Sequence, residues 1–221
     1  MKNIFDWYTL PMEIKKPIVT KNSLKKIESV KNRECLDIEN SILEDASFSS
    51  LEIEEIKCNT SIVESLSFSS AKIGDAMMLD SILNKCDFSG TVFKSASFER
   101  LEIHKSRLQG TQCMETRIKD VVIKNSKCTS CSFRFSKMKN VAFVDCDVSD
   151  ADFQGAEMEN VIFQNCTLRG ASFLSTKLIN VDIASSTIED IRIHKDSFGK
   201  VVVSTFQAIY LSSIFGLSIR D

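Results

Sequence analysis

The sequence contains little glycine, proline or histidine, and it has no long apolar segment. Its 221 residues include seven Gly, two Pro and two His. A chain of this length with conventional loops normally carries more Gly and Pro, so other residues must make the turns. No apolar run reaches the roughly 18 residues that a membrane-spanning helix needs, which excludes a membrane association of that kind.

We expect no signal peptide, because residues 1–10 contain one lysine and too short an apolar stretch. We therefore expect a cytoplasmic protein whose eight cysteines are thiols and not disulfides. The formal net charge of −2 indicates neither general attraction to nucleic acid nor strong repulsion from it.

The sequence has a repeat of five residues, which predicts regularly spaced turns without Gly or Pro. From Ile38 to Val203 every fifth residue is apolar or cysteine, without a phase slip; we call this position the large slot. Two residues before it lies a series of mostly small residues, the small slot. A period of five fits neither a helix nor a continuous strand, but two positions spaced by two point to the same side of an extended chain. Each unit is therefore interpreted as a short face with two inward residues, followed by a corner.

Larger residues recur in the small slot at intervals of twenty, so four units make one coil. These residues are Leu101, Val121, Val141, Val161, Val181 and Val201. The prediction is an all-β fold, a quadrilateral β-helix (solenoid) of about 8–9 coils with about 20 residues per coil. Strands about 4.8 Å apart would give a rod roughly 40 Å long.

The units resemble the consensus of the pentapeptide-repeat family: a small residue, an acidic residue or Asn, Leu or Phe, then two variable residues. Ala151-Asp152-Phe153-Gln154-Gly155 fits at every place and Cys86-Asp87-Phe88-Ser89-Gly90 nearly does. The resemblance covers residues 36–203. It implies a right-handed quadrilateral β-helix that acts as a binding or structural rod and has no enzymatic activity.

Stacked coils need caps, because a bare end exposes apolar core and unpaired strand edges. We expect residues 1–33 to form an N-terminal cap, residues 34–203 the solenoid, and residues 204–221 a C-terminal cap or dimerisation segment. In the first of these, Leu24, Ile27 and Val30 share one helical stripe.

Near the other end, Asp196 falls in an inward small slot, where an unpaired carboxylate is costly, so regular coiling should distort there. The tail beyond it is too apolar to remain exposed. We expect it to cover the last coil or to form a homodimer contact, and the family resemblance also implies dimerisation through the C-terminal end. The candidate interface residues are Phe206, Ile209, Tyr210, Ile214, Phe215 and Leu217.

The core should contain columns of like side chains. The large-slot candidates are Phe88, Phe93, Phe98, Phe133, Phe143, Phe153, Phe163 and Phe173. The small-slot candidates are Val121, Val141, Val161, Val181, Cys146 and Cys166. Cys128 and Cys131 form a CxxC motif that could indicate redox or zinc chemistry, but both positions point inward, which favours core packing.

No residue set for catalysis, a metal or a cofactor is apparent. His104 and His194 each follow a large-slot residue and should point outward, four and a half coils apart on opposite sides of the rod. We find no phosphate-binding loop, nucleophile–base set or carboxylate pair in a cleft. The expectation is a protein that is not an enzyme and has no cofactor.

Charge is unevenly distributed. Residues 34–80 carry eleven acidic residues against two lysines, residues 117–139 are mostly basic, and residues 145–159 are acidic. The bands are either solvated faces with paired neighbouring coils or a surface that steers a partner. Two functions are considered. The first is a protein-interaction or structural solenoid of unknown partner. The second is implied by the family resemblance, because several pentapeptide-repeat proteins resemble B-form DNA: a DNA-mimic protein that binds a topoisomerase (DNA gyrase) and protects it against quinolones or toxins. Direct nucleic-acid binding is disfavoured because the aromatic residues point inward.

Overall fold

A computed structural model describes residues 12–27 and 34–220 of the chain. Almost all of its regular structure is parallel β. The strands are β1 (Lys25–Ile27), β2 (Cys35–Glu39), β3 (Ser41–Glu44), β4 (Glu52–Asn59), β5 (Ile62–Glu64), β6 (Lys72–Asn84), β7 (Val92–His104), β8 (Arg117–Lys124), β9 (Lys137–Val144), β10 (Glu157–Gln164), β11 (Ser172–Phe173), β12 (Lys177–Asp182), β13 (Arg192–Ile193) and β14 (Phe198–Val202). One α-helix, α1 (Thr205–Ile214), follows the last strand.

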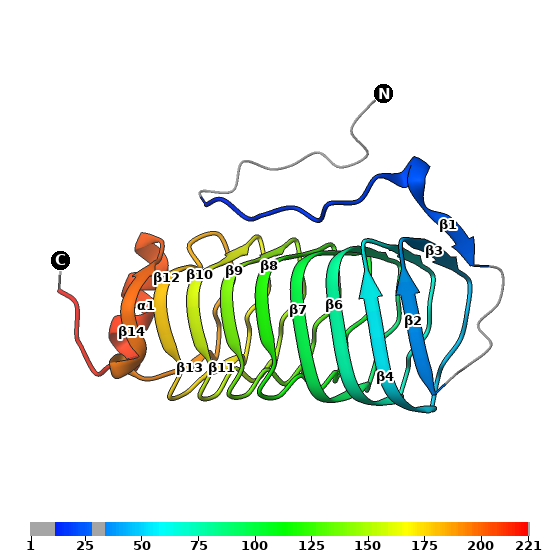
Figure 1. Cartoon of the computed structure of the whole chain (residues 1–221). Helices are drawn as coiled ribbons and strands as arrows, with labels where there is room; N and C mark the ends of the chain where they lie inside the picture. Colours follow the sequence, from blue (N-terminus) through cyan, green and yellow to red (C-terminus); the bar gives the residue numbers. More distant parts are fainter. Residues whose placement is uncertain (1–11, 28–33, 221) are drawn as a thin grey trace.

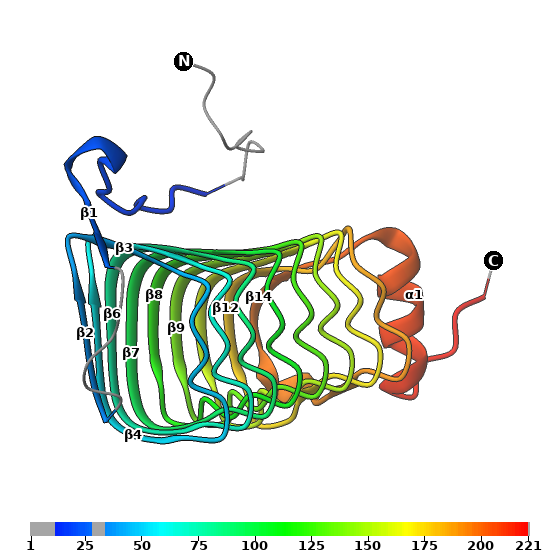
Figure 2. The ribbon, with the colours of Figure 1, turned by 90° about the vertical axis from the view of Figure 1, so that its right-hand side faces the viewer.

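Each strand pairs in parallel with the strand one coil further along the chain. Val121 of β8 is opposite Val141 of β9, and Val141 is opposite Val161 of β10. This register of twenty residues confirms the predicted solenoid, which has about nine turns. Figures 1 and 2 show the stacked coils from two sides, with α1 at one end.

Left-handed corner residues explain why so few glycines are needed. All the non-glycine residues with positive φ lie at positions divisible by five, two residues after a large slot. Many of them are Asn, Asp or Ser, and Asn and Asp adopt this conformation with less strain than most side chains. Four glycines of the solenoid occupy the same position. The corner is therefore the same left-handed backbone conformation in most repeats.

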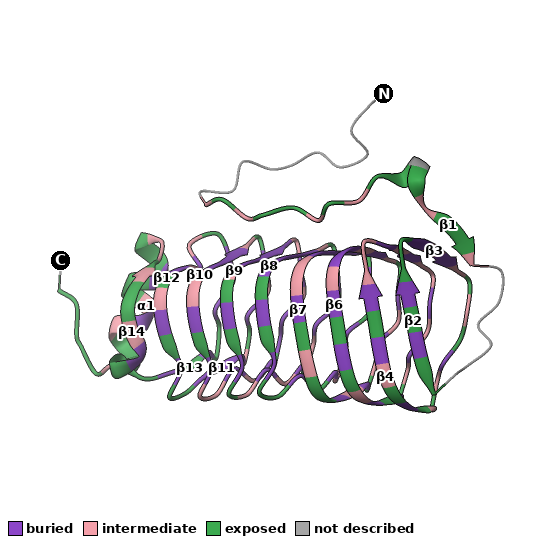
Figure 3. Ribbon diagram, in the orientation of Figure 1, coloured by how far each residue is buried: buried purple, intermediate pink, exposed green. Residues whose placement is uncertain are grey.

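The large slots form the core. Burial alternates along the strands, as Figure 3 shows. Phe133, Phe153 and Phe173 stack with ring centroids 5.3 and 5.0 Å apart, and Phe143 stacks on Phe163 at 4.9 Å. Offset stacking at these distances is favourable beyond the area that it buries.

The small-slot residues leave room for the large side chains, and those with a hydroxyl group also form hydrogen bonds between coils. Their hydroxyl groups donate to the carbonyl oxygen of a large-slot residue in the preceding coil. Thr91 Oγ1 donates to the carbonyl of Phe68 over 2.7 Å, and Ser186 Oγ donates to the carbonyl of Phe163 over 2.7 Å. A polar residue in this slot is therefore satisfied, which removes most of the cost of burying it.

Regular coiling ends where Asp196 occurs, as the sequence predicts. Residues Lys195–Ser197 form a short 3₁₀ helix that turns Asp196 outward and buries Ser197. The ladder between β12 and β14 then shifts register. The rotation avoids placing a carboxylate in the core.

The expected helical stripe near the N-terminus is wrong for the residues that the structure describes. Leu24 is extended, and Ile27 lies in β1, which pairs with β3. Val30 lies outside the described residues. The exposed edge of the first coil offers backbone hydrogen bonds to this segment, and these favour a strand over a short isolated helix.

The aromatic column predicts a large difference between inward and outward phenylalanines. Phe153→Ala should lower the free energy of unfolding by about 3–5 kcal/mol, because it leaves a cavity between two stacked rings. Phe135→Ala is the matched control: this ring is 51% exposed, so the loss should be about 1 kcal/mol or less. Urea unfolding followed by circular dichroism measures both. Equal losses would contradict the assignment of the core.

Candidate functional site

Several exposed charges pair between neighbouring coils. Lys72 lies 3.0 Å from Glu52, Lys119 lies 3.0 Å from Glu99, and Lys139 lies 2.7 Å from Glu159. Each pair is twenty residues apart, so it joins successive coils on one face. Such exposed pairs contribute little to stability. They do neutralise much of the charge banding that the sequence shows.

One outer face of the rod is apolar. On the units whose large slots are residues 43, 63, 83, 103, 123, 143 and 163, the residue just before the large slot points outward and is apolar in most coils. These residues are Ile42, Ile62, Ile82, Val122, Ala142 and Ile162. We call this the strap face. This column can be found in the sequence by comparing outward residues that are twenty positions apart. It is interrupted by Glu102 and Asp182.

The N-terminal segment covers part of the strap face. Residues 12–20, which we call the strap, run along the rod and lead back to β1 at the first coil (Figure 1). Met12 and Ile14 pack against a small outer cluster of buried side chains on this face. The cluster consists of Val122, Ala142, Val144 and Ile162. The sequence pattern did not reveal the strap, because this segment lacks the repeat.

Two backbone amides of the strap donate to carboxylates at the adjoining corner. The N–H of Lys15 donates to Oδ1 of Asp120 over 3.4 Å, and the N–H of Ile18 donates to Oδ1 of Asp80 over 3.2 Å. These Asp residues are corner residues two coils apart. Two coils span about 10 Å, and three extended residues span about the same distance. The strap is therefore extended between its two anchoring points.

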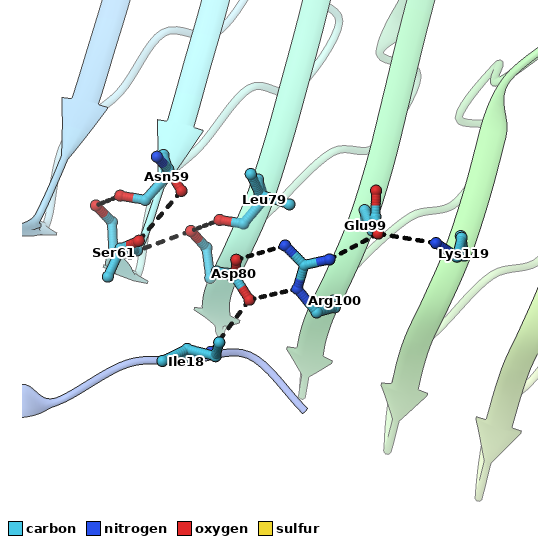
Figure 4. A network of polar contacts seen from close by, with 10 residues as sticks. Ile18, Asn59, Ser61, Leu79, Asp80, Glu99, Arg100 and Lys119 are labelled. Carbon is cyan, nitrogen blue, oxygen red and sulfur yellow. Dashed lines mark hydrogen bonds and ion pairs between the residues drawn. The ribbon is translucent and has the colours of Figure 1, made fainter. Parts of the chain in front are cut away.

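Asp80 is held in place by Arg100. The guanidinium donates from Nε to Oδ1 of Asp80 and from Nη2 to Oδ2, both over 2.7 Å, while Nη1 donates to Glu99 over 2.6 Å. Figure 4 shows this network, with Ile18 approaching Asp80 from the strap. The hydrogen bonds from Arg100 lower the pKa of Asp80, and the amide of Ile18 adds to this effect.

The same corner column continues as an amide ladder. Nδ2 of Asn140 donates to Oδ1 of Asp120 over 2.9 Å, and Asn160 and Asn180 repeat the contact at 3.0 and 3.2 Å. Asp120 is only 1% exposed, and its Oδ2 has no hydrogen-bond partner within the described ranges. A buried acceptor without a donor is costly and needs an explanation.

A buried acid–base pair lies on the strap face. Nε2 of His104 is 2.9 Å from Oε2 of Glu102. These side chains point outward from the coil, yet they are only 8% and 5% exposed. The coil that carries them is the one that the strap crosses between Asp120 and Asp80. His194 lies far along the rod at the other end, beside Asp196, so the two histidines do not share a site.

The predicted core residues all lie inside the solenoid. The large-slot candidates, Phe88, Phe93, Phe98, Phe133, Phe143, Phe153, Phe163 and Phe173, are at most 8% exposed. The small-slot candidates, Val121, Val141, Val161, Val181, Cys146 and Cys166, are at most 3% exposed.

The cysteines of the core are packed as thiols. Cys128 and Cys131 are fully buried, and neither they nor Cys146 and Cys166 form a disulfide. Burial raises the pKa of Cys58 to about 11 and that of Cys86 to about 12. Such thiols are protonated at neutral pH and unsuited to nucleophilic or metal-binding roles. Among the described residues, no cluster of three His, Cys, Asp or Glu is placed to bind a metal ion.

The C-terminal residues divide between two roles. Leu211 is buried, Gln207 donates to the carbonyls of Ile183 and Ser186, and the hydroxyl of Tyr210 accepts from the amide of Asp190. One side of α1 thus covers the last coil. Of the candidate interface residues, Tyr210 and Phe215 pack against the rod, whereas Phe206, Ile209, Ile214 and Leu217 are exposed. No helix of the described chain is long and apolar enough to cross a membrane.

The Asp80–Arg100 pair predicts a specific pH dependence of stability. Because the folded state lowers the pKa of Asp80, its ion pair stabilises the protein above the unfolded pKa of about 3.9. This contribution is lost as the pH falls through the folded pKa. Asp80→Asn should therefore reduce the free energy of unfolding at pH 7 and have a shrinking effect below about pH 4.

Urea unfolding from pH 7 to pH 2.5 measures this difference. Asn suits the left-handed corner, as it does at positions 140, 160 and 180 of the same column, so backbone strain does not confuse the comparison. Arg100→Gln should show the same pH profile, and the double variant should be less than additive. A constant difference at every pH would contradict the assignment.

Comparison with known proteins agrees with this geometry. The pentapeptide repeat region family matches residues 104–173, and the family of pentapeptide repeats in eight copies matches residues 80–110. No curated protein matches. Among solved structures, a trypsin-treated form of QnrB1, a plasmid-mediated fluoroquinolone resistance protein, is 16% identical, with 89% of this chain and 96% of that chain covered and a TM-score of 0.39. HetL, involved in heterocyst differentiation regulation in the cyanobacterium Nostoc sp. strain PCC 7120, is 12% identical, with 71% and 84% covered and a TM-score of 0.26. The chain therefore contains a pentapeptide-repeat region, which the two family models match between residues 80 and 173.

Proposed function

We propose that this protein is a non-enzymatic interaction rod that pairs with a second copy of itself through α1 and presents its long faces to a protein partner. The observation that carries the proposal is the outer side of α1. Phe206 is 86% exposed and Ile209 is 49% exposed, and Leu217 beyond the helix is 63% exposed. Large apolar side chains gathered at one place mark an interaction site.

The chemistry of α1 favours a second copy as the occupant. Thr205–Ile214 contains no charged residue, so two such helices can approach without like-charge repulsion. The helix lies at the end of the rod (Figure 2). A two-fold contact there uses the same patch on both chains. It would join two rods end to end and leave their side faces accessible.

The core of the rod is too tightly packed to bind a small molecule, so we expect binding only on the outer surface. The interior cavity between coils is about 30 Å³ and lined by apolar side chains such as Phe98 and Leu101. A small-molecule site is usually ten times larger or more. The larger hollows are open grooves on the outside, one of them between the charged columns of β8, β9, β10 and β12.

Self-association through α1 predicts a change in mass. Phe206→Asp combined with Ile209→Asp should halve the molecular mass measured by light scattering, because each charge would be buried unpaired in the contact. The helix should remain docked, since Gln207 and Leu211 are untouched. Leu174→Asp is the control: this side chain is 38% exposed on the solenoid. An unchanged mass in the double variant, or a monomeric parent protein, would overturn the proposal.

A second candidate function, binding of DNA gyrase as a DNA mimic, is favoured by the first coils. Asp37, Glu39, Asp45, Glu54 and Asp75 are on the surface, and none has an ion-pair partner among the described residues. Regularly spaced negative charge on a rod imitates a phosphate backbone. The basic residues of β8 and β9 oppose this function, although several of them are neutralised by glutamates one coil away.

Gyrase protection predicts a measurable effect in a supercoiling assay. Micromolar protein should restore supercoiling by gyrase in the presence of ciprofloxacin, and the charge reversals Asp37→Lys and Glu39→Lys should weaken the effect. Lys177→Glu, at the other end of the same face, is the control. If the protein changes neither supercoiling nor its inhibition, this second function is excluded, whereas the interaction rod is not.

A further inference from the structure

We propose that the strap face is a binding groove for an extended polypeptide segment, and that residues 12–20 of this chain occupy it in cis and must leave before a partner segment binds. The partner is a segment of the same chemistry as the strap: two pairs of apolar residues, like Met12/Ile14 and Pro17/Val19, with lysines between the pairs and backbone N–H groups that can donate. The proposal deepens the function proposed above by naming the surface that takes the protein partner.

The strap contacts the rod as a ligand contacts a groove. Met12, Ile14, Pro17 and Val19 are half-buried, while most of the residues between them are exposed. The side chain of Ile18 is 71% exposed although its amide reaches Asp80. Binding of an extended peptide typically combines main-chain hydrogen bonds with pockets for alternate side chains. The strap shows both features.

The spacing of the groove suits any extended chain. Corner residues on the same edge recur every 4.8 Å or so, and an extended chain advances about 3.3 Å per residue. Every third amide of a bound segment therefore meets every second coil. Lys15 and Ile18 illustrate this match with Asp120 and Asp80. The arrangement depends on the backbone, so it does not require the sequence of the strap itself.

Two features of the groove are difficult to explain as packing alone. Oδ2 of Asp120 is buried and has no donor among the described residues. The Glu102–His104 pair, with its two atoms 2.9 Å apart, is also buried on this outer face. A buried acceptor without a donor, such as Oδ2 of Asp120, is costly. A basic segment with spare N–H donors would fit this part of the groove better than an apolar one.

The outer apolar cluster is contacted by Met12 and Ile14 of the strap. Val122, Ala142 and Ile162 face outward, where a solenoid of this kind normally carries polar residues. The cluster is separate from the core cluster of the rod. The solenoid therefore does not need it for coil stacking, and its role is to hold an extended chain.

The proposal is tested on the full chain with a site-specific protease sequence inserted between Thr20 and Lys21. Cutting the folded protein turns the strap into a separate peptide. A fluorescent synthetic peptide with the sequence of residues 12–20 should then bind the cut protein, as measured by fluorescence anisotropy. It should bind the uncut protein about tenfold more weakly or less, because the strap competes at high effective concentration.

Matched variants locate the binding. Val122→Asp places a charge in the groove and should weaken peptide binding by about tenfold or more. Val92→Asp is the control, since Val92 occupies the same place in its repeat on the opposite face of the rod. In the uncut chain, hydrogen exchange provides a second measurement: the amides of Lys15 and Ile18 should be protected in the parent and in Val92→Asp but exchange faster in Val122→Asp.

The proposal is overturned if the cut protein keeps its β circular dichroism spectrum but does not bind the peptide, or if both aspartate variants bind it equally. It is also overturned if the strap amides exchange as fast as exposed ones in the parent. None of these results bears on the mass change expected from the α1 variants. Failure of the groove and failure of the self-association are therefore distinguishable.

Discussion

The hydrogen bonds between successive coils determine every other feature of this molecule. They fix a spacing of about 4.8 Å between equivalent residues. At that spacing phenylalanine rings stack, as Phe143 and Phe163 do, and side-chain amides form a ladder at the corner. Lysines also reach the glutamates of the next coil. A residue twenty positions away is therefore a closer neighbour, in physical terms, than most residues nearby in sequence.

The sequence was sufficient to predict the solenoid because its inward pattern is enforced locally. Each large slot must be apolar, since a polar side chain without a partner is costly inside a narrow core. This rule makes every fifth residue apolar, and the larger residues that recur in the small slot every twenty residues indicate four sides per coil. Asp196, the residue that breaks the rule, identified the point of distortion correctly.

The parts that could not be predicted depend on contacts that produce no repeating pattern in the sequence. The strap is an aperiodic segment whose conformation is set by a surface more than a hundred residues away, through Lys15 and Asp120. The spacing of Leu24 and Ile27 fits a helix, but this segment instead forms β1, because the open edge of β3 offers it backbone hydrogen bonds. The burial of His104 could not be foreseen either, because an outward position is exposed only if nothing lies over it.

The strap also changes how the polar groups on the outer face should be understood. A cap for the first coil would need only β1 and the residues next to it, because stacking is a nearest-neighbour effect. The strap instead reaches several coils along the rod, as far as the cluster around Ala142. There the amide of Lys15 contacts Asp120, a buried carboxylate with one oxygen that has no donor among the described residues and whose burial works against stability. Groups that cost stability in the folded protein tend to occur where a surface must recognise something. The contacts of the strap are thus better explained by recognition of an extended chain than by closure of the rod.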